Sequence, residues 1–111
     1  MARKIVCLCG STRFPDEFVE ANLQETLAGN IVLSVGAFVN SAQKVHGRDV
    51  DVETYKEALD GLHIDKIKMS DEILVINVGG YVGESTKNEI DFARQQGVPI
   101  RWLEPDKALP G

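Results

Sequence analysis

The chain has 111 residues, with 12 Lys and Arg against 17 Asp and Glu, so its formal net charge is -5. This acidic balance argues against a protein that holds nucleic-acid polymers through their phosphates. No apolar stretch approaches the roughly 20 residues of a membrane span, and the N-terminus lacks a signal-peptide profile. With 43% apolar residues, the chain has enough material for one modest core. We therefore expect a soluble, cytoplasmic protein with a single domain over residues 1–111.

Short apolar runs alternate with helical patterns along the chain. Four runs are expected to be buried strands: residues 5–9, 31–35, 72–77 and 100–103. Three helices are expected between them, one from Pro15 to a stop at Gly29-Asn30, one over residues 53–69 and one over about 85–96. Gly61 weakens the second helix and could split it in two. The alternation predicts a small doubly wound α/β fold, Rossmann-like or flavodoxin-like, with a parallel sheet of four to five strands.

The expected sheet is small, and this bears on the oligomeric state. In the first helix, Phe14, Phe18 and Ala21 and the row of Val19, Leu23 and Leu27 supply an apolar side. Trp102 in the last expected strand fits either a core or a subunit interface. Four strands leave an edge or face that a second copy of the chain could complete. We therefore expect a homo-oligomer, a dimer or higher.

The two cysteines, Cys7 and Cys9, lie two residues apart in the first apolar run. A disulfide at that spacing would be strained within one strand. The sequence also places no further Cys or His at the usual spacing of a zinc motif. We therefore expect no disulfide, no metal site and no cofactor.

The carboxyl edge of the sheet is where a ligand is expected, because ligands of such folds bind there near the switch in strand order. The segments at that edge are Gly10 to Phe14, Gly36 to Asp49 and Val78 to Glu89, and they are polar and rich in glycine. His46, in the second segment, could meet a base or a phosphate, or it is a solvated loop residue. Tyr81, in the third, could stack on a base or cover the site.

The loop after the first strand contains Gly10, Ser11, Thr12 and Arg13. Its glycine, hydroxyls and guanidinium, next to a helix N-terminus, suit a phosphate group. The same residues also suit an ordinary strand-to-helix turn with Arg13 in solvent. A third interpretation is a Cys-dependent phosphatase, because five residues separate Cys7 from Arg13, as in low-molecular-weight tyrosine phosphatases. Against it, a thiol inside an apolar strand is usually inert.

Glu89 is the carboxylate of interest at the start of the third expected helix. Thr86 and Glu89 have the spacing of a capping box, which would occupy the carboxylate structurally. Alternatively, Glu89 faces the site, where a carboxylate can stabilise or attack the cationic carbon of a sugar. A position in the first turn of the helix would keep it ionised.

The run Cys9-Gly10-Ser11-Thr12-Arg13 after a first strand resembles the nucleoside 2-deoxyribosyltransferase superfamily, and is most similar to its 2'-deoxynucleoside 5'-monophosphate N-hydrolase branch. Met69-Ser70-Asp71 before an apolar strand is similar as well. So are Glu89-Ile90-x-Phe92-Ala93 and Gly97-Val98-Pro99-Ile100 after a glycine-containing loop. The likeness covers most of residues 3 to 104 in order, through short motifs.

The resemblance implies roles for individual residues. Glu89 would be the catalytic carboxylate at the anomeric carbon. Gly10, Ser11 and Arg13 would line the site under the 5' end of the sugar. In members that use monophosphates, Ser11 would bind the phosphate together with groups near Gly83 and Ser85.

The chain departs from the family pattern at three places. The Asp that handles the leaving base falls on His63, a type more often packed or on the surface, and Asp65 could replace it only if the helix shifts or splits. A Tyr near the end of the first strand is replaced by Cys7, and an Asp that binds the 5'-hydroxyl falls on Gly83, next to Glu84.

Three functions follow from these patterns. The first is an N-glycosidase or deoxyribosyltransferase that acts on a nucleoside or nucleoside 5'-monophosphate, with Glu89 and Asp65 as its catalytic residues. The second is a module that binds such a nucleotide without cleaving it. The third is the phosphatase that depends on Cys7.

Overall fold

The computed structural model describes residues 3–35, 44–45, 48–49 and 52–110. His46 and most of the segment from residue 36 to residue 49 lie outside the described residues. Within the part described, no helix is long and apolar enough to cross a membrane.

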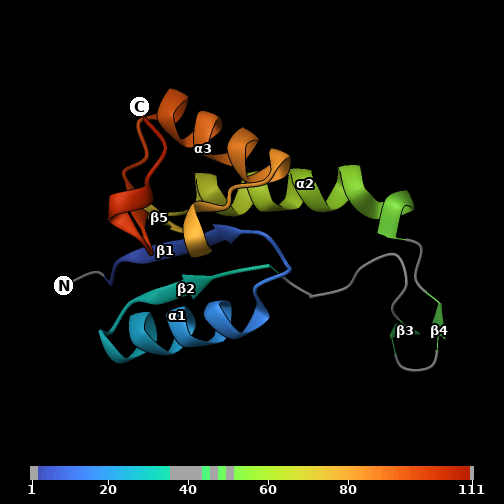
Figure 1. The fold of residues 1–111 in the computed structure, drawn as a ribbon, viewed down its shortest axis with the longest axis horizontal. Helices are drawn as coiled ribbons and strands as arrows, with labels where there is room; N and C mark the ends of the chain where they lie inside the picture. The colour runs from blue at the N-terminus through green and yellow to red at the C-terminus, as the bar shows by residue number, and fades with distance from the viewer. Residues whose placement is uncertain (1–2, 36–43, 46–47, 50–51, 111) are drawn as a thin grey trace.

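The central sheet has four parallel strands in the order β2-β1-β5-β6 (Figure 1). Its strands are β1 (Ile5–Gly10), β2 (Ile31–Leu33), β5 (Glu72–Ile76) and β6 (Ile100–Trp102). All neighbouring pairs run in the same direction. The predicted α/β fold with a small parallel sheet is therefore confirmed. A two-stranded antiparallel ribbon, β3 (Lys44–Val45) with β4 (Arg48–Asp49), was not predicted from the sequence.

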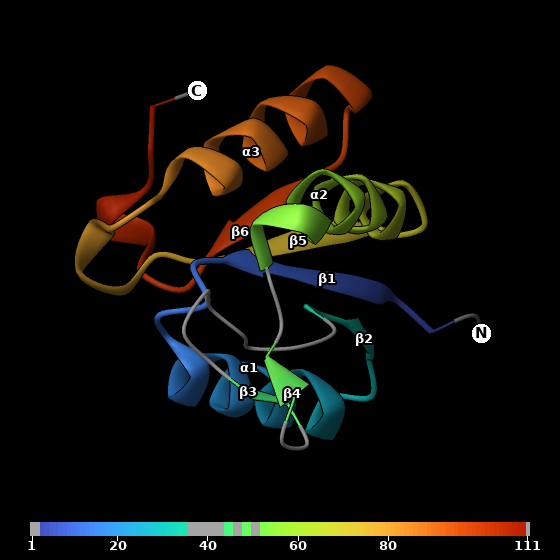
Figure 2. The ribbon, with the colours of Figure 1, turned by 90° about the vertical axis from the view of Figure 1, so that its right-hand side faces the viewer.

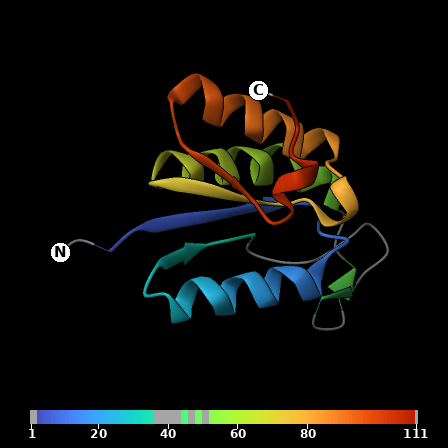
Figure 3. The ribbon, with the colours of Figure 1, turned by 60° about the vertical axis from the view of Figure 1, so that its left-hand side comes forward.

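The helices form a layer on each face of the sheet. α1 (Pro15–Leu27) covers one face, whereas α2 (Val52–Lys68) and α3 (Glu84–Gln96) lie together on the other (Figures 2 and 3). Single turns of 3-10 helix follow β5 and β6, at Val78–Gly80 and Pro105–Lys107. From the central strand β1 the chain passes to β2 at one edge of the sheet, and from the central strand β5 it passes to β6 at the other edge. The direction in which strands are added therefore reverses between β1 and β5, which makes this the switch point of the sheet. Ligands of doubly wound sheets bind at the carboxyl ends of such a pair.

Two expectations about the helices are wrong. α2 continues through Gly61 without a break, because nothing crowds that exposed position and the helical pattern resumes after it. In α1, the row of Val19, Leu23 and Leu27 is exposed by 49 to 73%. The buried face carries Phe18 and Ala21, as expected, together with Glu25, and it lies on nearly the opposite side of the helix from that row. The exposed row is available to a partner, and the expected homo-oligomer stays a prediction.

The two faces of β1 belong to two different cores. Val6 and Leu8 pack with Phe18 and other residues on the α1 side. Cys7 and Cys9 pack with Ile67, Ile90 and others on the side of α2 and α3. Because successive side chains of a strand alternate, residues 7 and 9 share a face. Both thiols therefore lie between the sheet and the α2–α3 layer.

Gly10 ends β1 opposite Ile76, its register partner on β5. A Cβ at this position would lie 3.0 Å from both the Cβ and the carbonyl oxygen of Ile76 and 3.3 Å from the ring of Phe18. We expect Gly10→Ala to lower the free energy of unfolding by about 1–3 kcal/mol through overpacking. Gly61→Ala, in open space on a helix, should raise it by about 0.5–1 kcal/mol. Urea denaturation measures both, and equal effects would contradict this packing.

Arg101 on β6 joins two buried carboxylates away from the carboxyl edge. It pairs with Glu25 of α1 and donates to Glu72 of β5 at 3.1 Å. The hydrogen bond from Arg101 holds the pKa of Glu25 below its usual value. The stabilisation is therefore present above the ordinary carboxyl pKa and is lost as the pH falls through the lower, folded-state pKa.

Arg101→Met tests this network. Near pH 7 we expect it to lower the free energy of unfolding by roughly 1–3 kcal/mol, because Glu25 then loses its charged donor, whereas Glu72 keeps Lys4 at 3.2 Å. The difference from wild type should shrink in acid, where Glu25 is protonated. Denaturant titrations at several pH values measure it, and a difference that grows in acid would contradict the assignment.

Candidate active site

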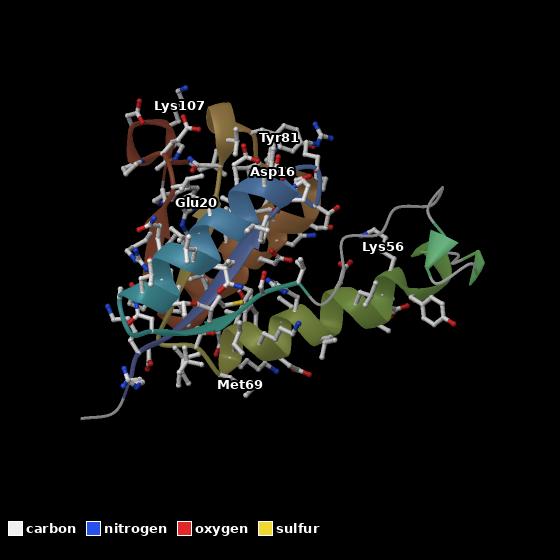
Figure 4. All side chains as sticks on the ribbon, turned by 90° about the horizontal axis from the view of Figure 1, so that it is seen from below. Asp16, Glu20, Lys56, Met69, Tyr81 and Lys107 are labelled. Atoms are coloured by element: carbon white, nitrogen blue, oxygen red, sulfur yellow. The ribbon has the colours of Figure 1, made fainter. Side chains whose placement is uncertain are left out.

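The loop after β1 and the segment before α3 contact each other at the carboxyl edge. The Arg13 guanidinium lies over the Tyr81 ring, 4.0 Å from its centroid, and the Phe14 ring meets the same ring edge-on at 5.9 Å. Figure 4 shows Tyr81 at the end of α1 that carries Asp16. The backbone N–H of Arg13 donates a hydrogen bond to Ser11 Oγ at 3.2 Å, which tightens the loop. The switch point is thus built from two segments that sequence analysis had assigned to the site.

Glu89 lies in the second turn of α3. The helix begins at Glu84 after an extended Gly83, and no side chain caps it. Thr86 is already inside the helix and is buried, so the predicted capping box between Thr86 and Glu89 is wrong. The Glu89 carboxylate therefore does not cap the helix.

A small hollow opens between α2 and α3, with a cavity volume of about 50 Å³. Its lining residues are Asp60, Ile64, Ser85, Asn88 and Glu89. At its rim, Lys56 Nζ bonds to Asp60 Oδ2 at 2.9 Å and to Ser85 Oγ at 3.3 Å, which links α2 to α3. The hollow thus offers two carboxylates, a hydroxyl and an ammonium group to a ligand.

Behind the hollow, Glu89 joins a buried cluster with Cys7, Cys9 and His63. His63 Nε2 lies 3.4 Å from Cys9 Sγ, 3.6 Å from Cys7 Sγ and 3.9 Å from Glu89 Oε1. The side chains of His63 and Glu89 are 8% and 12% exposed, and both thiols are fully buried. The cluster unites one strand and two helices.

The burial of this cluster changes the acidity of its members. Burial raises the pKa of Glu89 to about 7, although the neighbouring His63 acts in the opposite direction. Burial also opposes protonation of His63, but Cys7 and Glu89 together raise the His63 pKa above its ordinary value. The expectation that a helix N-terminus keeps Glu89 ionised by lowering its pKa is wrong, because Glu89 lies beyond the first turn and is shielded from water.

The two thiols differ in their pKa values. A hydrogen bond from Cys9, with help from His63, lowers the pKa of Cys7 to about 5 against the effect of burial. The interaction with Cys7, together with burial, raises the pKa of Cys9 well above its usual range. Cys7 is therefore the more acidic thiol of the pair.

The structure brings together some of the predicted site residues and separates others. Ser85 and Glu89 share the hollow, and Gly83 precedes their helix. Asp65 does not join them: its side chain is 68% exposed and pairs with Lys68 at 3.8 Å. Its assumed role required a shifted or split helix, and α2 is continuous.

The loop residues Gly10, Ser11, Thr12 and Arg13 lie at the end of β1, where Thr12 and Arg13 are exposed. His46 falls outside the described residues. These loop groups therefore face the switch point, while Ser85 and Glu89 line the hollow between α2 and α3.

Sequence reasoning missed three contributions: Asp60, His63 and the cysteine pair. Asp60, His63 and Ile67 follow one another at helical spacings of three and four, which predicts a common face once α2 is known to be continuous. The partners of that face, Cys7 and Cys9, are more than fifty residues away in sequence. Only the sheet topology brings them together.

The same topology argues against the phosphatase interpretation. Cys7 Sγ is fully buried on the α2–α3 side of β1. The loop from Gly10 to Phe14 leads instead to α1 on the opposite face. A phosphate bound by that loop would therefore not meet the thiol.

Comparisons of the chain with protein-family models, with curated proteins and with solved structures found no significant match. The function is therefore argued from the geometry of this site.

Proposed function

We propose that the chain is an N-glycosidase that acts on a nucleoside or a nucleoside 5'-monophosphate, with Glu89 as the carboxylate at C1'. The observation that carries this proposal is the position of Glu89 in the hollow between α2 and α3, against the buried His63. The family resemblance of the motif around Glu89 supports the same role.

The chemistry requires a carboxylate at the sugar carbon, because glycosidic bonds break through transition states with oxocarbenium character. Glu89 Oε attacks C1', and the base leaves with the electron pair of the C1'–N bond. Water then hydrolyses the resulting ester, or a second base attacks C1' and completes a transfer. A largely buried carboxylate interacts strongly with the developing positive charge, because little water screens it.

His63 acts in this proposal as a positioning residue. Its Nε2 lies 3.9 Å from Glu89 Oε1, and the pair is shielded from solvent. A protonated imidazole there favours the ionised carboxylate and holds it toward the hollow. His63 occupies the sequence position at which the similar family has its base-handling Asp, but it acts through Glu89.

Asp60 is the second carboxylate of the hollow and is assigned to the leaving base. It comes from the same helix as His63 and lines the hollow with Glu89. The base takes up a proton as it leaves, and Asp60 is the group of the hollow that can pass to it a proton taken from water. Lys56 and Ser85 at the rim supply donors for a 5'-phosphate.

A substrate panel tests the proposal. The protein is incubated with ribo- and deoxyribonucleosides and their 5'-monophosphates, and the products are separated chromatographically. Release of free base supports the N-glycosidase. Tight nucleotide binding without turnover would contradict the N-glycosidase and indicate a nucleotide-binding module. Release of inorganic phosphate would indicate the phosphatase instead.

A further inference from the structure

The cluster behind the hollow contains three ligand atoms of the kinds that zinc prefers. They are Sγ of Cys7, Sγ of Cys9 and Nε2 of His63, and all three lie within 4.8 Å of one another. Neither thiol forms a disulfide. Proton sharing between two thiols and an imidazole explains part of this arrangement, but its distances also fit a metal centre.

The distances can be compared with those around a tetrahedral ion. With metal–sulfur bonds of about 2.3 Å and metal–nitrogen bonds of about 2.0–2.1 Å, a tetrahedral centre places S and N about 3.6 Å apart and two sulfurs about 3.8 Å apart. The observed Sγ to Nε2 distances are 3.6 and 3.4 Å. The two sulfur-to-nitrogen distances therefore already match those of zinc ligands, and the two sulfurs, which lie within 4.8 Å of each other, need to approach by at most about 1 Å.

We propose that Cys7, Cys9 and His63 form a binding site for a thiophilic divalent cation, of which Zn²⁺ is the expected one. Two sulfurs and an imidazole nitrogen favour zinc over Mg²⁺ or Ca²⁺, which prefer oxygen ligands. Binding requires both thiols as thiolates and Nε2 of His63 without a proton, so the protons that these three atoms carry pass to solvent as the ion enters.

Charge and position support the site. Two thiolates and a divalent cation form a neutral unit, which suits side chains that are almost completely buried. Glu89 supplies a carboxylate beside these three atoms, with Oε1 3.9 Å from His63 Nε2. It also lines the hollow, which provides the path by which an ion reaches the sulfurs. Modest movement of the Glu89 carboxylate would complete four-coordination.

Metal binding and the proposed glycosidase use His63 in different ways. With an ion on Nε2, the imidazole no longer acts as a cation beside Glu89, and the carboxylate is drawn toward the metal. As far as the proposed function holds, the zinc-loaded protein should therefore be at least tenfold less active than the metal-free protein, and a chelator should restore activity. Metal binding itself does not depend on that function.

Cobalt(II) substitution tests the site directly. The reduced, metal-free wild-type chain is titrated with Co²⁺, and absorption is followed in the thiolate-to-cobalt charge-transfer and ligand-field regions. We expect one ion per chain, intense tetrahedral bands, and displacement by Zn²⁺ but not by Mg²⁺. Cys9→Ser and His63→Gln should each weaken binding at least a hundredfold. Ile67→Val, a small change in the same core, should leave it unchanged.

A second measurement covers variants that fail to fold. Ligand binding to the native state raises its thermal stability, so Zn²⁺ should raise the melting temperature of the wild type and of Ile67→Val, reversibly with a chelator. Absence of the cobalt bands and of this shift in the wild type would overturn the proposal. Bands that persist in a folded His63→Gln protein would overturn it as well.

Discussion

Glu89→Gln is expected to reduce the release of free base by at least about a thousandfold, with nucleotide binding largely kept. The amide is nearly isosteric with the carboxylate, but it neither attacks C1' nor carries the charge that stabilises a sugar cation. A thousandfold loss corresponds to about 4 kcal/mol of transition-state stabilisation. Initial rates with the substrate found in the panel, together with equilibrium binding of the same nucleotide, measure the effect.

Glu84→Gln is the matched control for this substitution. Glu84 starts the same helix and is exposed, whereas Glu89 lines the hollow. The control should keep its rate to within a few-fold. If Glu89→Gln retained full activity, or if both variants lost it equally, the site would lie elsewhere.

Asp60→Asn is expected to reduce base release by roughly a hundredfold, the size of effect that general-acid catalysis commonly supplies. The loss should be smaller for a substrate whose base leaves readily without a proton. The comparison with Asp65→Asn is informative, because both aspartates lie on α2, but only Asp60 lines the hollow.

Asp65→Asn should leave the rate unchanged, since the Asp65 side chain is 68% exposed and pairs with Lys68. Steady-state kinetics with a normal and an activated leaving group separate the two variants. A loss at Asp65 with none at Asp60 would contradict the geometry and support the role that the sequence motif assigns to Asp65.

Regular features of the fold could be read from the sequence because they depend on local patterns. Pro15 begins α1, and Gly97 ends α3 in a left-handed conformation with φ 71°. The apolar runs around Cys7 and Val75 mark the two central strands, which are buried on both faces. The edge strand β2 was overestimated, since the run from residue 31 to residue 35 forms only three strand residues and Ile31 is 46% exposed.

The candidate site could be predicted only in part. Glu89 was found through its motif, and Ser85 through its place near the sheet edge. His63 and the thiols could not be connected with Glu89, because their proximity arises where β1, α2 and α3 converge. The acidity of Glu89 was misjudged for the same reason: local spacing suggests an ionised carboxylate near a helix start, whereas tertiary burial raises its pKa to about 7.

The proposed attack of Glu89 on C1' is tested by identifying the group that becomes covalently bound to Glu89 during turnover. Wild-type protein is quenched with acid during turnover of a nucleoside or nucleoside monophosphate that releases base, then digested and examined by mass spectrometry. The mechanism predicts the mass of the sugar, or sugar phosphate, on the peptide that contains Glu89, and its loss in Glu89→Gln. A phosphoryl group on Cys7, or base release with no sugar on any peptide, would contradict attack by Glu89 on C1'.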